Sequence, residues 1–125
     1  MLEVYSLFVD TEANSAIPLN NVTIEKGCTA VSVSPATIQL NKCGVYMVSV
    51  DASSTTSATI QLYKNGTPQP QAQSTGTSIG FTTLVQVATN NSECPCASPT
   101  LLQLFNTDDA AATYDNVNVC VTKIC

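Results

Sequence analysis

The chain of 125 residues contains no histidine, no tryptophan and no arginine, and only 10% of its residues are charged. Without histidine, neither a Ser-His-Asp triad nor a Cys-His pair can form, so these common routes of nucleophilic catalysis are excluded. Without arginine, and with four scattered lysines and a net charge of −5, the chain lacks the clustered cations that bind nucleic acid. We therefore expect a non-enzymatic protein with no nucleic-acid partner.

Long apolar runs are also absent, whereas a helix that spans a membrane needs about 20 apolar residues. The first apolar run, Leu2–Val9, is too short for a signal peptide and is acidic at Glu3 and Asp10. The sequence thus predicts no membrane partner and no cleaved leader. Six cysteines nevertheless indicate disulfides formed outside the cytosol. A virion component released from a cell satisfies both indications, as does a chain whose leader has been removed.

The residues that are abundant favour β structure. Ser and Thr fill 29 of the 125 positions (12 Ser and 17 Thr), and β-branched residues dominate the apolar runs. Strong helix formers are few. The length suits one domain with its own core, so we expect a single all-β domain over residues 1–125.

Extended segments separated by turn-rich stretches run along the whole chain, as an antiparallel sandwich of about eight to ten strands requires. The last of them places Val117, Val119 and Val121 on one side, which predicts that these valines face the core. The segments are Leu2–Asp10, Asn21–Ile24, Cys28–Val33, Thr37–Leu40, Val45–Ala52, Ala58–Tyr63, Gln71–Ser74, Gly80–Ala88, Thr100–Phe105 and Tyr114–Ile124.

Two segments in the middle of the chain resemble the jelly roll of tumour necrosis factor-like domains, a superfamily that includes the complement head. Cys43–Val50 enters a strand from a glycine and places the aromatic Tyr46 on one face with Val48 and Val50, and Val45 and Met47 on the other. Ala58–Gly66 alternates apolar and polar residues and stops at Asn65-Gly66, a dipeptide favoured in turns with positive φ. The resemblance implies a compact homotrimer that binds or caps another molecule.

Further segments are similar to bacterial and phage members of that superfamily, including the heads of collagen-like spore-surface glycoproteins. Ile17–Thr23 resembles their first sheet-entering segment and Asn116–Ile124 their last strand, while Cys28–Gly76 resembles small proteins of phages that infect Gram-positive gut bacteria. The resemblance covers Ile17–Cys125 and leaves residues 1–16 as a possible docking or edge segment. Unlike the spore proteins, this chain has no collagen-like Gly-X-Y stalk and is rich in cysteine.

The resemblance also implies where subunits meet, because the corresponding strands form the sheet nearest the threefold axis. One face of Val45–Ala52 and of Gly80–Ala88, together with the outward side of the last strand, is therefore expected between subunits. The residues expected at this trimer interface are Tyr46, Val48, Phe81, Asn118, Cys120 and Thr122.

The spacing of two cysteines predicts a disulfide. If the chain turns at Ser34–Thr37, residues whose numbers sum to 71 face each other, which pairs Val33 with Ile38 and Cys28 with Cys43. Residues directly opposed on two strands lie close enough for a disulfide. We therefore predict a Cys28–Cys43 bridge.

The other four cysteines leave several pairings open. Cys94 and Cys96 lie in one loop, and a bridge between them would be strained, so we expect one of them to pair with Cys125. Cys120 is expected to be a free thiol or an inter-subunit contact. A zinc site is the competing interpretation, but the chain has one C-x-C, no C-x-x-C and no histidine.

Acidic residues offer little chemistry. Asp51, Asp108, Asp109 and Asp115 fall at strand ends or in loops, where carboxylates are usually solvated. Two acids could support glycoside hydrolysis, and the Asp108-Asp109 region could offer oxygen ligands to calcium, but no ordered calcium loop is present. We predict no catalytic residues, no metal and no cofactor.

Three functions remain after these exclusions. The first is a trimeric phage virion structural protein, either a capsid decoration or a fibre-head module on the particle exterior, bound to a major capsid or other virion protein. The second is a head that recognises a receptor or glycan on a host surface. The third is a spore-surface head. Residues Ser53–Ser57 and Asn90–Ser98 are the loops expected to contact the outside.

Overall fold

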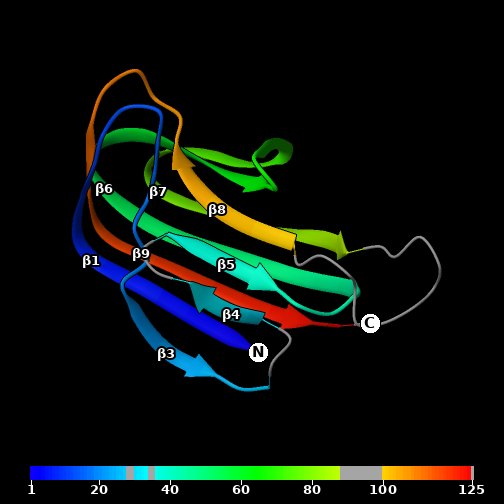
Figure 1. Cartoon of the computed structure of the whole chain (residues 1–125). Helices are drawn as coiled ribbons and strands as arrows, with labels where there is room; N and C mark the ends of the chain where they lie inside the picture. Colours follow the sequence, from blue (N-terminus) through cyan, green and yellow to red (C-terminus); the bar gives the residue numbers. More distant parts are fainter. Residues whose placement is uncertain (28–29, 34–35, 88–99, 125) are drawn as a thin grey trace.

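The computed structural model describes residues 1–27, 30–33, 36–87 and 100–124. Every regular element in this part of the chain is a β-strand, and all pairings are antiparallel, as the composition predicts (Figure 1). No helix long and apolar enough to cross a membrane occurs in these ranges. The strands are β1 (Leu2–Thr11), β2 (Ser15–Ala16), β3 (Asn21–Glu25), β4 (Ala30–Val33), β5 (Thr37–Leu40), β6 (Gly44–Lys64), β7 (Thr67–Val87), β8 (Thr100–Asn106) and β9 (Ala112–Lys123).

The strands form two packed layers that share β6 and β7. In the layer called the first sheet, the order is β3-β1-β9-β6-β7, with the first half of β6 beside β9. In the second sheet, the second half of β6 pairs with β8, which continues to β5 and β4, while β2 also pairs with β8. Figure 1 shows β8, β5 and β4 in front of the layer that holds β1, β9 and β6. The fold is an antiparallel jelly-roll sandwich.

The long strands β6 and β7 correct one sequence prediction. Four shorter strands were expected here, with Ser53–Ser57 as a loop. Instead, the first two expected strands are parts of β6 and the last two are parts of β7, and each of these is one continuous strand of 21 residues. The β6–β7 register shifts between Ser53 and Ala58, where the hairpin passes from one sheet to the other. The hairpin closes at Asn65 and Gly66 with φ values of 51° and 80°, as the dipeptide predicts.

Alternating apolar residues build the core between the sheets. Val117, Val119 and Val121 of β9 are fully buried, as predicted. The inward side of β6 is equally buried, and the Tyr46 hydroxyl donates a hydrogen bond to the Lys42 carbonyl oxygen at 2.7 Å. Fully burying one such apolar side chain contributes roughly 1.5–3 kcal/mol. The largest fully buried side chains are Tyr46, Tyr114, Leu2, Ile17, Leu40, Ile60, Leu62, Leu102, Leu104, Val4, Val48 and Val50.

The β4–β5 hairpin has a different register from the predicted one. Val33 pairs with Thr37 and Ala30 with Leu40, so the numbers of paired residues sum to 70 rather than 71. The prediction is wrong because only three residues connect the strands, which moves every pair by one position. This register places the buried Ala30 opposite the buried Leu40.

Strand β1 does not lie at the edge of its sheet. β1 pairs with β3 on one side and with β9 on the other, and its Leu2 and Val4 side chains are fully buried. The prediction of an edge segment is therefore wrong for β1, because this strand lies inside the first sheet. A docking role for residues 1–16 remains a prediction.

One end of the sandwich, called the crossover end, holds the bends of β6 and β7 and the loops 12–14 and 107–111 (Figure 1). Thr59 joins these parts, since its N–H donates to Asp108 Oδ2 at 3.0 Å and its carbonyl accepts from the Thr107 N–H at 3.1 Å. Asn14 N–H donates to the Asp108 carbonyl at 3.3 Å. Asp108 therefore stabilises the loops at this end. Both chain ends lie at the opposite end.

Candidate interaction faces

The sandwich presents two broad outward faces, one on each sheet. The first face is defined by the outward side chains of β1, β9, β6 and β7 in the first sheet, and the second face by those of β5, β8, β6 and β7 in the second sheet. Because the sheets pack by their inner sides, the two faces point in opposite directions.

Apolar side chains are exposed on the first face near the end that carries the chain ends. Met47 lies directly between Thr122 of β9 and Leu84 of β7. Met47 is 40% exposed and Leu84 is 58% exposed, so two large apolar side chains stand side by side in solvent. Neighbouring exposed apolar residues of this kind favour contact with another protein surface.

Cys120 also lies on the first face, where it pairs with Ser49, two residues along β6 from Met47. Its thiol is free and donates a hydrogen bond to Glu3 Oε2 at 3.0 Å. Burial and then the bonded Glu3 carboxylate raise the pKa of Cys120 to about 11, with Asp51 adding to the effect. The thiol is therefore protonated at neutral pH and is a poor nucleophile. Cys120 acts here as a hydrogen-bond donor.

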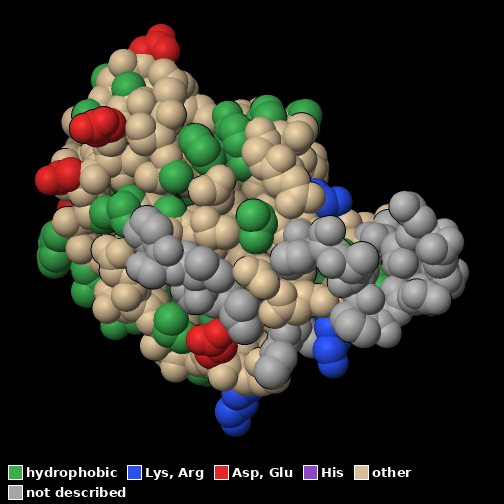
Figure 2. All heavy atoms as spheres, viewed as in Figure 1, with side chains coloured by type: hydrophobic (Ala, Val, Ile, Leu, Met, Phe, Trp, Pro, Cys, Tyr) green, Lys and Arg blue, Asp and Glu red, His purple; other side chains and the backbone are tan. Residues whose placement is uncertain are grey.

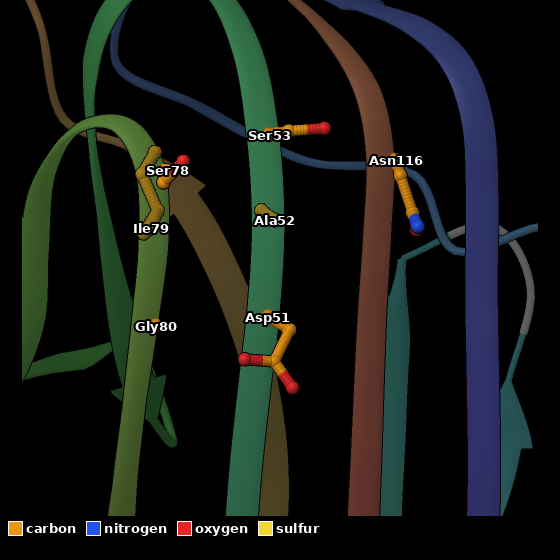
Figure 3. Close-up of a pocket in the computed structure, with 7 residues that line it drawn as sticks. All are labelled: Asp51, Ala52, Ser53, Ser78, Ile79, Gly80 and Asn116. Carbon is orange, nitrogen blue, oxygen red and sulfur yellow. The ribbon is translucent and has the colours of Figure 1, made fainter.

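A shallow pocket of about 430 Å³ opens on the first face near the crossover end (Figure 3). The Asp51 carboxylate lies over Gly80 of the paired strand, and a Cβ at residue 80 would approach Asp51 Oδ1 to 3.2 Å. Gly80 therefore leaves the room that Asp51 occupies. The lining residues are Asp51, Ala52 and Ser53 of β6, Ser78, Ile79 and Gly80 of β7, and Asn116 of β9.

Half of the expected interface residues lie on the first face. Asn118, Cys120 and Thr122 are half-buried outward side chains of β9. Tyr46 and Val48 are not on any surface, because both side chains are fully buried between the sheets. Their assignment to the interface is corrected to the core, since the outward positions of β6 are the alternate residues.

The expected interface residue Phe81 is also turned inward. It is partly buried and packs against the core cluster from β7. Its outward neighbours Thr82 and Gly80 are exposed. Phe81 therefore contributes to the margin of the core rather than to the first face.

Most of the predicted disulfides fall outside the described residues. Cys43 is buried and disulfide-bonded, but its partner is not among the described residues. Cys28, Cys94, Cys96 and Cys125 themselves lie outside that part of the chain, as does the predicted contact loop 90–98. The Cys28–Cys43 pairing and the pairings of Cys94, Cys96 and Cys125 stay predictions.

The acidic residues that the structure describes form no recognisable metal centre. Within the described ranges, no group of three or more His, Cys, Asp or Glu side chains could hold a metal ion. Asp10 accepts a hydrogen bond from the Thr113 hydroxyl at 2.7 Å, and Asp108 stabilises the crossover end. These carboxylates therefore have structural roles.

The second face has a different composition. Tyr63 of β6 and Phe105 of β8 stack at 4.1 Å between ring centroids with an interplanar angle of 23°. Glutamines surround this pair, because Gln103 lies opposite Tyr63 and Gln61 lies opposite Phe105. Gln73 of β7 faces Gln61 on the other side. The stacked rings are therefore surrounded by amide side chains.

Sequence reasoning missed both the pocket and the glutamines. The pocket joins Asp51 to Asn116, which are 65 positions apart, so only the register brings them together. The glutamines did carry a signal, because Gln61 and Gln103 alternate with buried leucines along their strands. The same alternation that identifies the core identifies this outward set.

The chain matches no protein-family model and no curated protein sequence. Its structure is similar to several solved domains. The globular domain of zebrafish complement 1qA has a TM-score of 0.76 and 9% identity, with 99% of this chain and 96% of that chain covered. The PRD1 vertex protein P5 has a TM-score of 0.67 and 15% identity, with 99% of this chain and 96% of that chain covered. Murine APRIL has a TM-score of 0.67 and 8% identity, with 98% of each chain covered.

These similarities extend over almost the whole of each chain, at identities that indicate fold alone. The chain has the tumour necrosis factor/C1q-like jelly-roll fold, as the resemblance of Cys43–Val50 and Ala58–Gly66 implies.

Proposed function

We propose that this protein is a non-enzymatic structural protein of a phage virion, a homotrimeric capsid decoration or fibre-head module on the particle exterior. The observation that carries the proposal is the similarity to the PRD1 vertex protein P5 over almost the full length of both chains. A rigid sandwich with few charged residues and no recognisable metal centre in its described part suits a stable coat protein.

The trimer is proposed to assemble through the first face. Domains with this fold are usually homotrimers. In a monomer the Met47 and Leu84 side chains are exposed to solvent, and their burial between subunits would favour association. Around them, Thr122 and Cys120 supply half-buried side chains that a neighbouring subunit would cover. Docking onto a major capsid or other virion protein is part of the same proposal.

Two measurements test this function. Mass spectrometry of purified particles should find the chain in multiples of three, and light scattering of the isolated protein should give the mass of a trimer. Particles that lack the chain, or a stable monomer at micromolar concentration, would contradict the proposal. So would a reproducible hydrolase activity lost on substitution of Asp108 and Asp109, because those acids have no proposed catalytic role.

A second candidate function is a head that recognises a host-surface glycan. The observation that favours it is the second face, which remains open to solvent in a trimer formed through the first face because the two faces point in opposite directions.

A further inference from the structure

We propose that the second face binds a neutral oligosaccharide, with the Tyr63–Phe105 pair as its centre. The inference deepens the second candidate function and does not require that the chain be part of a virion. It rests on three properties of the face: stacked aromatic rings, anchored amide side chains and an absence of charge among the described outward positions.

The aromatic pair provides the apolar part of the site. Tyr63 and Phe105 are diagonal neighbours on adjacent strands and both are half-exposed. At a centroid separation of 4.1 Å and an interplanar angle of 23°, the two rings stack face to face, so the pair offers its outer ring faces and its ring edges to a ligand. The apolar face of a sugar ring packs on such a surface. The Tyr63 hydroxyl makes no hydrogen bond to the described chain and is therefore available to a ligand.

The glutamines provide the polar part, and each is held in place by one hydrogen bond. Gln61 Nε2 donates to the Gln69 carbonyl at 3.1 Å, and Gln103 Nε2 donates to Thr37 Oγ1 at 3.4 Å. Gln39 Nε2 donates to Asn41 Oδ1 at 2.7 Å. One N–H of each amide is thus fixed to the protein, while its second N–H and its oxygen remain for a ligand. Anchored amides lose less conformational freedom when they bind.

The absence of charge selects the kind of ligand. The outward residues of β5, β8, β6 and β7 within the described part of this face are amides, hydroxyls, aromatic rings, Leu101 and Pro68, with no acid and no lysine among them. In Figure 2, most acidic side chains lie at the top and upper left, one lies at the lower centre, and lysines lie at the right and lower margins. An acidic sugar or a phosphate would find no cation to pair with here, whereas uncharged hydroxyls match the amides.

The dimensions favour a short chain of sugars over a single ring. Four strands separated by about 4.8 Å span about 14 Å across the face. Three outward rows along the strands cover a similar distance, since alternate residues are about 6.7 Å apart. A ligand that uses both the ring pair and the flanking glutamines therefore extends beyond one sugar unit.

The test is an array of neutral and acidic oligosaccharides of two to four units, probed with the full chain. We expect binding to neutral members and none to acidic ones. Tyr63→Ala and Phe105→Ala should each weaken binding at least tenfold, and Gln103→Glu, which keeps the side-chain size and adds a charge, should weaken it as well. The matched control is Thr82→Ala on the first face, which also removes a surface side chain and should leave binding unchanged.

Several results would overturn the inference. They are no binding to any neutral member, preferential binding to acidic members, or equal losses in Thr82→Ala and Tyr63→Ala. Circular dichroism and light scattering on every variant separate loss of binding from loss of fold or of the trimer. A monomer that still binds neutral sugars would contradict the proposed trimer and support this site, and a virion-bound trimer that binds no sugar would do the reverse.

Discussion

The outward faces of the first and second sheets are formed in part by the same two strands, β6 and β7, yet they present different chemistry. The first face carries exposed Met47 and Leu84 beside a carboxylate–thiol pair and a shallow pocket. The second face carries a stacked aromatic pair among glutamines and no charge at its described outward positions. On this difference rest the two proposals, self-association through the first face and ligand binding on the second.

The largest expected effect separates the two faces directly. Leu84→Glu places a charge in the apolar patch of the first face, so we expect the trimer to dissociate to monomers. The matched control is Leu101→Glu on the second face, where an exposed leucine of the same kind receives the same charge. Light scattering should show a monomer for Leu84→Glu and an unchanged trimer for Leu101→Glu. If Leu101→Glu dissociates the trimer and Leu84→Glu does not, the subunit interface lies on the second face.

The next effect separates the two sides of β6. Val48 is fully buried, so Val48→Ala should lower the free energy of unfolding by about 2 kcal/mol through lost burial and a cavity. Its neighbour Ser49 points outward, and Ser49→Ala should change the free energy by less than about 0.5 kcal/mol. Urea unfolding measures both values. If the Val48→Ala trimer dissociates without a loss of subunit stability, Val48 belongs to the subunit interface and not to the core.

A smaller effect concerns backbone strain in β1. Three non-glycine residues have φ values near +52°, and two of them are asparagines, which tolerate this region. The third is Phe8, whose side chain is 77% exposed and gains little from burial. Phe8→Asn should therefore raise the free energy of unfolding by about 1 kcal/mol. Leu7→Asn, at an exposed neighbour without positive φ, should not stabilise the protein, and thermal unfolding of both variants tests the difference.

The smallest effect is a pH dependence that belongs to the first face. The pKa of Cys120 is raised from 9.0 to about 11 in the folded protein, so the folded state holds this proton more tightly than the unfolded state. The resulting stability is fully present below about pH 9 and is lost as the pH rises toward 11. Cys120→Ser removes the titrating group, so wild type should lose more stability than this variant between pH 9 and 11 in urea unfolding. Parallel losses would show that the thiol is not responsible.

Much of the fold follows from local patterns in the sequence. The alternation of Val117, Val119 and Val121 predicts the inward side of β9, and Asn65-Gly66 predicts the turn between β6 and β7. The continuity of β6 is not predictable in this way, because the polar Ser53–Ser57 segment has the composition of a loop. Backbone pairing holds only its start, because Ser53 pairs with Ser78 and Asn116 and Ser54 pairs with Tyr114. The buried Ser54 hydroxyl also donates a hydrogen bond to the Thr113 carbonyl at 3.3 Å, a contact that the local sequence does not predict.

The candidate sites were harder to predict than the fold. Assigning Tyr46 and Val48 to an interface required knowing which side of a strand meets the second sheet, and this depends on tertiary packing. The outward glutamines of the second face follow the strand alternation, but their grouping around Tyr63 and Phe105 depends on the pairing of β6 with β8. Pairings between distant strands are set by the whole fold, so local patterns do not specify them.

The β6–β7 hairpin has a consequence for how the chain folds. Its tip returns to its own base, because Lys64 Nζ donates to the Gln86 carbonyl at 2.7 Å, and Gln86 pairs with Val45 at the start of β6. One ribbon, closed by a two-residue turn and bent once at its middle, therefore supplies a template strand to each layer. Hairpin closure is fast compared with the pairing of distant strands. We therefore expect assembly to proceed from the turn outward, with β9 adding to the first half of β6 and β8 to its second half.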